Sequence, residues 1–314
     1  TVKPATARGG AEAWFQLANL HFREKAYAES AAAFEKLFQL YPADERIAVA
    51  ALPRAWALCN AKMPADALRR AEGILAASNG ADAVSASQGQ TGVEEWLYLK
   101  ANCLRQLLKP GEAADTYAKL QELFPDGRFA RAAAFENAMA LFRAGRFPET
   151  LRQAKAIPPD ASNEKDLYWM MAESFMALHN EEGAIQYYKL LLDKCASSDL
   201  APDAGYRLGH LLQKRAEYAA AADVFGGVAA GYATNEIAPQ ALFAAASCRN
   251  RAGKHEEAAR DLGTLLQKYP ASPLAEEARY QKAMEEIVLL RDEQAVSSLR
   301  EFLGKLREEQ LITR

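Results

Sequence analysis

The amino-acid sequence predicts an all-α solenoid of about eight helical hairpins. First, small residues recur along the 314-residue chain at intervals of 34 to 46 residues, most often 37. Second, aromatic or aliphatic side chains follow many of them four and seven residues later, which is the spacing of an amphipathic helix. Third, proline or glycine separates many of the successive helices. Repetition at this period is typical of stacked hairpins, because one hairpin cannot bury both of its faces alone.

Two small residues define each repeat. The marker residue is the small residue of the second helix: Ser30, Ala67, Ala113, Thr150, Ala184, Ala221, Ala258 and Ala295. The crossing residue lies twelve residues earlier, on the first helix: Ala18, Ala55, Ala101, Ala138, Ala172, Gly209, Ala246 and Ala283. Small side chains on both helices let two backbones approach closely, so we expect each pair to lie where the helices of one hairpin cross.

The first repeat occupies residues 11–42, and Pro42 ends its second helix because proline cannot continue the hydrogen-bonding pattern. We expect residues 1–10 to be a flexible segment. The chain starts with Thr1 and not with Met, so we expect a processed or truncated form, in which a targeting segment would be missing. A later link reads YPASPLAEEA, where Ser272 is suited to cap the next helix and Pro273 to its first turn.

Two repeats depart from the common length. A polar segment rich in Gly and Ser, residues 78–92, lengthens one interval to 46 and predicts a surface loop, either a tolerated insertion or a binding loop. The fourth repeat should have a short second helix, since Pro158 and Pro159 follow it closely. We therefore expect a bend between repeats 1–4, residues 11–160, and repeats 5–8, residues 161–314.

The last repeat carries Arg279 and Glu286 where inward residues are expected. A terminal repeat needs a polar outer face, so these residues predict C-terminal capping helices.

The repeats resemble the tetratricopeptide repeat (TPR), whose pattern is W-x2-L-G-x2-Y…A-x3-F…P. The matching residues are Trp14, Leu17, Ala18, Phe34 and Pro42, then Leu208, Gly209, Ala221 and Phe225, then Ala258, Leu262 and Pro270. The resemblance covers residues 11 to 310 and implies a right-handed α-solenoid of TPR-like hairpins. The 37-residue period and the YP-A-S-P link are also similar to a bacterial envelope branch. That branch includes the Tol-Pal accessory protein and the outer-membrane-assembly lipoprotein.

Composition and motifs argue against several other classes. The net charge of −3 leaves no basic footprint for nucleic acid, and no apolar run is long enough to span a membrane. The cysteines (Cys59, Cys103, Cys195 and Cys248) form no metal-binding or redox motif, and the four histidines lie in different repeats. We find no catalytic, cofactor or phosphate-binding motif, so we expect neither an enzyme nor a bound cofactor.

The candidate binding surface follows the first helices, which line the inner curve of such solenoids. Three residues before the crossing residues stand Phe15, Leu52, Tyr98, Phe135, Trp169, Tyr206, Phe243 and Tyr280, seven of which are aromatic. Basic residues near the helix ends are Arg23, Arg105, Arg143, Lys214 and Arg251. The predicted partner-binding residues are Phe135, Met139, Phe142, Arg143, Trp169, Tyr98, Asn102, Arg105, Tyr206 and His210, with the first five at the centre. Such a groove suits a peptide, whose carboxylates would pair with the guanidinium groups.

A structural interpretation of the same residues is also open. Regular apolar spacing usually means packing between helices, and cations in a last turn stabilise the helix dipole without any ligand. The carboxylate clamp that TPR chaperone adaptors use is not apparent. Asn19 fits one of its positions, but Phe15, Glu95 and Leu99 stand where Lys or Arg is expected.

The sequence therefore favours a non-catalytic scaffold that binds a peptide or protein partner in its groove, in a bacterial periplasm or cell envelope. The alternatives are a cytoplasmic adaptor and a structural or self-assembling module of a larger protein. The sequence names neither the partner nor the oligomeric state.

Overall fold

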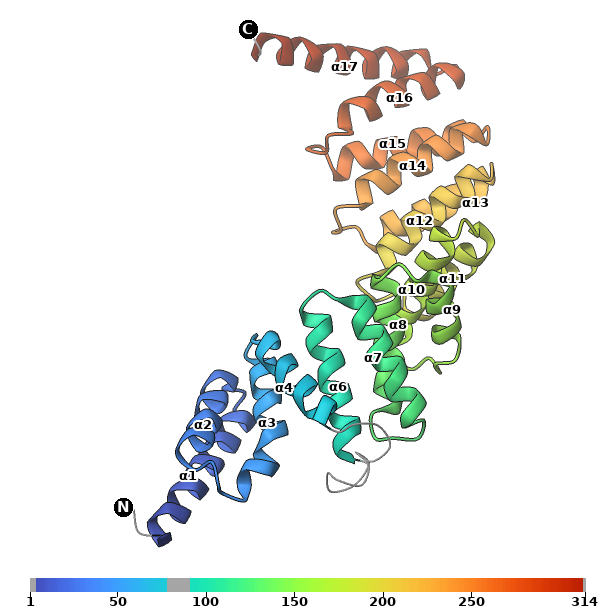
Figure 1. Cartoon of the computed structure of the whole chain (residues 1–314). Helices are drawn as coiled ribbons and strands as arrows, with labels where there is room; N and C mark the ends of the chain where they lie inside the picture. Colours follow the sequence, from blue (N-terminus) through green and yellow to red (C-terminus); the bar gives the residue numbers. More distant parts are fainter. Residues whose placement is uncertain (1–3, 78–90, 313–314) are drawn as a thin grey trace. The chain divides into compact units, whose positions relative to one another are not determined.

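The computed structural model describes residues 4–77 and 91–312, and sixteen α-helices account for most of them (Figure 1). In the numbering of Figure 1, the first eight are α1 (Pro4–Arg23), α2 (Tyr27–Leu40), α3 (Arg46–Asn60), α4 (Pro64–Ala77), α6 (Thr91–Gln106), α7 (Pro110–Leu123), α8 (Ala130–Arg143) and α9 (Phe147–Lys155). The other eight are α10 (Glu164–Ala177), α11 (Glu181–Lys194), α12 (Ala201–Lys214), α13 (Tyr218–Gly231), α14 (Ala238–Arg251), α15 (His255–Lys268), α16 (Ala275–Val288) and α17 (Asp292–Ile312).

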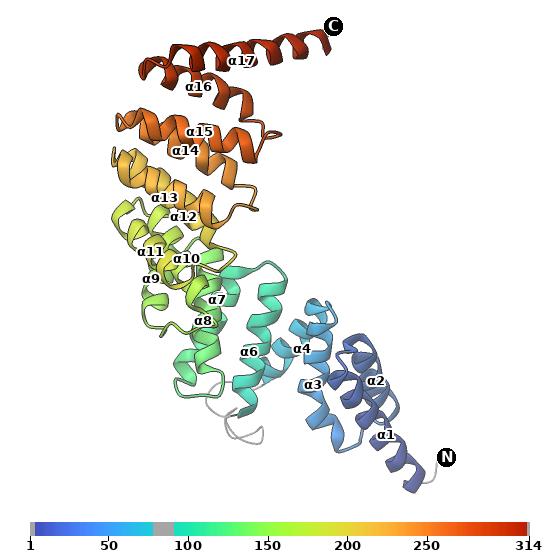
Figure 2. The same cartoon turned by 180° about the vertical axis from the view of Figure 1, so that it is seen from behind.

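The helices pair in sequence order into eight antiparallel hairpins, from α1 with α2 to α16 with α17. The chain divides into two compact units, residues 1–158 (unit 1) and 159–314 (unit 2). Within each unit, successive hairpins lie side by side, as the two opposite views show (Figures 1 and 2). The predicted fold class, an all-helical array of about eight TPR-like hairpins, is confirmed.

The predicted crossing and marker residues lie where the helices of each hairpin meet. All sixteen are buried. In the first hairpin the Ser30 hydroxyl donates a 2.8 Å hydrogen bond to the Ala18 carbonyl across the crossing. In the sixth, a Cβ atom on Gly209 would lie 2.5 Å from the ring of buried Phe225. The predicted register is therefore confirmed.

Every hairpin turn has the same backbone conformation. The residue five positions before each marker residue has a φ between 55° and 73°: Lys25, Lys62, Leu108, Gly145, His179, Ala216, Gly253 and Leu290. The next residue donates its N–H to a carbonyl five residues earlier, as Lys109 does to Leu104 at 3.0 Å. This bond satisfies a carbonyl at the end of the first helix and reverses the chain. Only two of the eight positions carry glycine, the residue that adopts this conformation without strain.

Polar contacts 33 to 36 residues apart join neighbouring hairpins. Arg46 pairs with Glu12 at 2.7 Å, and the buried Glu94 carboxylate accepts the Phe129 N–H at 2.7 Å. The Tyr232 hydroxyl donates to the Ala196 carbonyl at 2.7 Å. Each repeat is thus stabilised mainly by its immediate neighbours, as expected for a stacked array.

Three expectations about individual segments have different outcomes. The first helix begins at Pro4, within the segment 1–10 that we expected to be flexible, because proline suits a first helical turn and Ala and Arg favour helix. The α9 helix has only nine residues, which confirms the short second helix of the fourth repeat. The predicted loop 78–92 falls, up to residue 90, outside the described residues.

Candidate functional site

The aromatic ladder on the first helices is part of the packing inside each hairpin. The Tyr98 ring lies edge-on to buried Tyr117 on the second helix, with centroids 6.0 Å apart. The same edge-on contact recurs in three more hairpins: Phe15 with Phe34, Trp169 with Tyr188, and Tyr206 with Phe225. The ladder rings stay half-buried, whereas their partners are fully buried. These four rings therefore close the core, and only their outer edges face the surface.

On α6, three predicted residues lie together and are already bonded. The Tyr98 ring stacks on Phe129 with centroids 4.5 Å apart. The Asn102 amide donates to the Tyr98 carbonyl at 2.9 Å and accepts from Arg105 at 3.1 Å. Arg105 also forms a 3.4 Å ion pair with Glu136 of α8. These side chains hold α6 and α8 together, so the Arg105 charge is largely neutralised.

On α8, by contrast, three predicted residues form an unpaired stripe. Phe135, Met139 and Arg143 are spaced by four residues, so they follow one side of the helix. Phe135 and Met139 are half-buried and Arg143 is exposed. Within the part of the chain that the structure describes, none of the three side chains forms a hydrogen bond, ion pair or ring contact. We call these residues the α8 stripe.

Phe142 does not belong to this stripe. Its ring lies edge-on to Phe147 across the hairpin turn, with centroids 6.1 Å apart. A similar pair, Phe22 with Tyr27, lies at the first hairpin turn. Phe142 therefore packs against the hairpin turn and stands apart from the α8 stripe.

The remaining predicted residues, Trp169, Tyr206 and His210, belong to unit 2. Arg207 lies over the Trp169 ring at 5.3 Å and pairs with Glu173 at 3.3 Å, and Glu173 also accepts the Tyr188 hydroxyl. His210 is exposed, and its ring stands edge-on to Tyr206 with centroids 4.5 Å apart. The aromatic and acidic groups of this face thus form their own local network.

Sequence reasoning missed an acidic pocket of about 230 Å³ between α14 and α16. Glu285 is buried at its floor and accepts hydrogen bonds from Asn250 and, at 2.8 Å, from His255. Glu277 lies at its rim and accepts from Gln281 at 2.8 Å. The sequence signal for this pocket is the charged Glu285, two residues after the crossing residue of the last repeat. The sixth and seventh repeats carry the apolar Leu211 and Cys248 at the same position.

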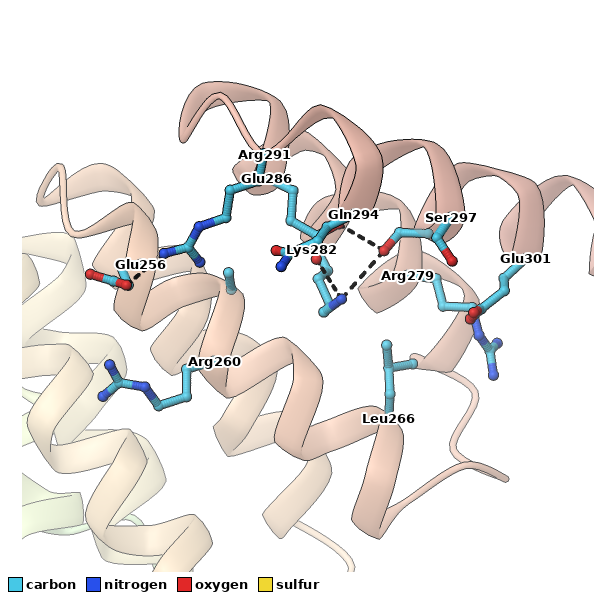
Figure 3. A pocket seen from close by; sticks show the side chains of 12 residues that line it. Glu256, Arg260, Leu266, Arg279, Lys282, Glu286, Arg291, Gln294, Ser297 and Glu301 are labelled. Carbon is cyan, nitrogen blue, oxygen red and sulfur yellow. Dashed lines mark hydrogen bonds and ion pairs between the residues drawn. The ribbon is translucent and has the colours of Figure 1, made fainter.

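A second polar pocket, of about 500 Å³, is lined by residues of α15, α16 and α17 (Figure 3). Glu286 is buried there and binds Lys282 at 2.6 Å and the Ser298 hydroxyl at 2.8 Å. Arg291 pairs with Glu256 across its edge at 2.6 Å. We expected Glu286 to belong to a polar outer face, but α17 covers it, so its carboxylate joins α16 to α17. These opposite charges satisfy one another and stabilise the last hairpin.

The described residues contain no group of three or more His, Cys, Asp and Glu side chains placed to hold a metal ion. None of the helices described has both the length and the apolar content needed to cross a membrane.

Comparison with known proteins identifies the repeats. Residues 11–44 and 240–272 each match a tetratricopeptide repeat family model. The matches identify the first and seventh hairpins as tetratricopeptide repeats, and the other hairpins share their register. Tetratricopeptide repeat proteins generally act as scaffolds for protein–protein interaction. No curated protein matches the sequence.

Solved structures share the fold at low sequence identity. One is the C-terminal part of a TPR repeat-containing protein from Cytophaga hutchinsonii, at 13% identity and a TM-score of 0.63. It aligns over 84% of this chain and 98% of its own. Another is the apo form of RapI, at 10% identity and a TM-score of 0.54, aligned over 98% of this chain and 88% of its own. At such identities the likeness concerns the fold alone.

Proposed function

We propose that this chain is a non-catalytic scaffold whose unit 1 binds an acidic peptide segment of a protein partner on the α8 stripe. The observation that carries the proposal is the unpaired state of Phe135, Met139 and Arg143 on one side of α8. Aromatic residues, Met and Arg are enriched in protein interfaces. Most other predicted groove residues are already bonded within their own unit.

The chemistry of the stripe indicates the partner. Arg143 is an exposed guanidinium without a carboxylate, so it can hold an Asp or Glu side chain through two parallel hydrogen bonds. Met139 is flexible and adapts to irregular apolar groups, and Phe135 supplies an aromatic anchor. A helical partner segment in which an apolar residue lies within two helical turns of an acidic residue would contact all three side chains of the α8 stripe.

We further propose a bacterial periplasm or cell envelope as the compartment. The support is the 37-residue period and the YP-A-S-P link, which resemble those of envelope repeat proteins. Fractionation of the native host, with the chain detected by antibody, tests this: recovery from the cytosol would favour the cytoplasmic adaptor. Sedimentation of the purified chain tests the self-assembling alternative, which predicts a concentration-dependent increase in mass.

The binding test compares two variants with a matched control. The partner is first isolated from native extract, and its affinity is then measured for Phe135→Ala, Arg143→Glu and Arg152→Glu. Arg152 is an exposed arginine on second helix α9 and serves as the control. A hydrogen bond to a charged group contributes about 1.5–3 kcal/mol, so Arg143→Glu should weaken binding roughly tenfold to a hundredfold.

Phe135→Ala should weaken binding mainly through faster dissociation, since most affinity changes within one interface are changes in off-rate. Arg143→Glu should also reduce the dependence of affinity on salt. Circular dichroism checks that each variant is folded. Unchanged affinity in both folded variants, or an equal loss in Arg152→Glu, would exclude the α8 stripe as the contact.

A further inference from the structure

A small pocket in unit 1, away from α8, combines a buried arginine with aromatic walls. It has a volume of about 220 Å³ and lies among α2, α3, α4 and α6. Arg54, Arg69 and Arg70 contribute three guanidinium groups, and Phe38 and Trp96 contribute aromatic rings.

Arg54 is the central residue. It is only 3% exposed, and its guanidinium lies over the Phe38 ring at 4.3 Å. Its Nε atom is buried and has no hydrogen-bond partner in the part of the chain that the structure describes. An unpaired buried donor normally costs free energy, so its persistence indicates a missing partner.

Hairpin packing does not require an arginine here. Arg54 lies one residue before its crossing residue, where the fifth and sixth repeats carry Met171 and Leu208. Those apolar side chains are buried at the same register. An apolar residue would therefore serve the fold equally well, and would avoid the cost of burying a charge.

The charges around Arg54 are not balanced. The carboxylate of Glu35 is the ion-pair partner of both Arg54 and Arg70, the latter at 3.7 Å. Arg69 pairs separately with Asp66. Burial and the nearby Arg70 lower the pKa of Arg54 to about 10, because both disfavour the positive charge of its own guanidinium group. One carboxylate therefore serves two guanidinium groups beside an open space.

We propose that this pocket binds the carboxylate of an aromatic or otherwise flat apolar group, between the guanidinium groups of Arg54 and Arg70. The apolar part of the ligand would lie against Trp96 and Phe38. A monoanion suits the site better than a phosphate dianion, because Glu35 remains close and repels a second negative charge. The carboxylate can come from a free aromatic acid or from an Asp or Glu side chain beside an apolar residue in a protein.

The test uses 4-fluorobenzoate as the free acid, with neutral 4-fluorobenzamide as the matched control, and fluorine NMR to measure binding. Arg70→Ala should weaken fluorobenzoate binding about tenfold or more, the effect of losing one charged hydrogen bond. Glu35→Gln should strengthen it by a similar factor, because it removes the internal carboxylate that competes for the same guanidinium groups. Arg152→Ala should change nothing. Arg54→Met, which introduces the residue found at this register in the fifth repeat, should abolish binding in a chain that remains folded by circular dichroism.

A second probe distinguishes the two sources of the carboxylate. N-acetyl-Glu-Phe-amide carries one side-chain carboxylate next to an aromatic ring. Displacement of fluorobenzoate by this dipeptide supports a protein segment as the ligand, whereas binding of fluorobenzoate alone supports a free acid. The proposal is overturned if fluorobenzoate binds no better than fluorobenzamide, or if Arg70→Ala and Glu35→Gln leave its affinity unchanged. Arg143→Glu lies outside the pocket and should not affect either probe, so failure of this proposal is separable from failure of the α8 stripe.

Discussion

Replacing Gly209 with Ala should destabilise unit 2, although the same substitution usually stabilises a helix. An added Cβ would lie 2.5, 2.6 and 2.7 Å from three ring atoms of Phe225. Phe225 is fully buried, so its ring cannot move without displacing other core residues. Overpacking of this kind costs about 1–3 kcal/mol. The gain in helix propensity returns about 1 kcal/mol, so we expect a net loss of up to about 2 kcal/mol.

Gly227 of α13 provides the matched control. It lies within a helix, is exposed, and a Cβ there would meet nothing within 4 Å. Gly227→Ala should therefore stabilise the chain by about 1 kcal/mol through helix propensity alone. The packing argument thus predicts opposite signs for one chemical change at two positions in neighbouring helices of one hairpin.

The assay is urea unfolding followed by circular dichroism, with the two variants and the unchanged chain measured together. Gly209→Ala should lower the urea midpoint and Gly227→Ala should raise it. Repeat arrays do not always unfold in one step, so hydrogen exchange in α12 and α13 provides a local measurement. An increase in midpoint for Gly209→Ala would refute the close crossing of α12 and α13.

Three further predictions concern other parts of the fold. Ala258→Leu should cost about 1–3 kcal/mol in chemical unfolding, because the marker residue is fully buried, and a loss under about 0.5 kcal/mol would contradict the register. Leu108→Gly should stabilise the chain by up to about 1 kcal/mol and so raise the midpoint of thermal unfolding, because Leu108 has a φ of 58° and a side chain that is 87% exposed. A lower midpoint would show that the leucine side chain contributes to stability. Cys195 should be the first cysteine to react with iodoacetamide, as followed by mass spectrometry, since the other three are buried. Burial and Glu164 raise the pKa of the Cys195 thiol, so the rate at which it is labelled should continue to increase with pH above about 8.5, the ordinary thiol pKa. Early labelling of Cys59 or Cys103 would contradict the burial of those two thiols.

The fold could be predicted because its information is local and repeated. Two small residues twelve positions apart, such as Gly209 and Ala221, recur in all eight repeats. A position assigned wrongly in one repeat is therefore corrected by comparison with the other seven. The same regularity predicted the short α9 from two prolines. The positive φ at the hairpin turns could not be predicted, because Leu108 and Ala216 give no sign of that conformation without the bond that closes the turn.

The binding surface was less predictable, because it depends on which side chains meet across repeats. Arg105 and Arg143 look equivalent in the sequence, but Glu136 neutralises only Arg105. Phe142 and Phe135 are both aromatic residues of α8, yet only Phe142 has a ring to pack against at the turn. Such differences arise from contacts between residues of different helices, and helical periodicity alone carries no information on them.

The measurement that tests the central claim most directly is site-specific photo-crosslinking on α8. A photoreactive phenylalanine derivative replaces Met139 in one variant and Lys119, an exposed residue of the second helix α7, in the other. The α8 stripe predicts a crosslink to an acidic segment of the isolated partner from position 139, little from position 119, and loss of the first when Arg143→Glu is added. Equal crosslinking from both positions, or a crosslink at 139 that Arg143→Glu leaves intact, would contradict it.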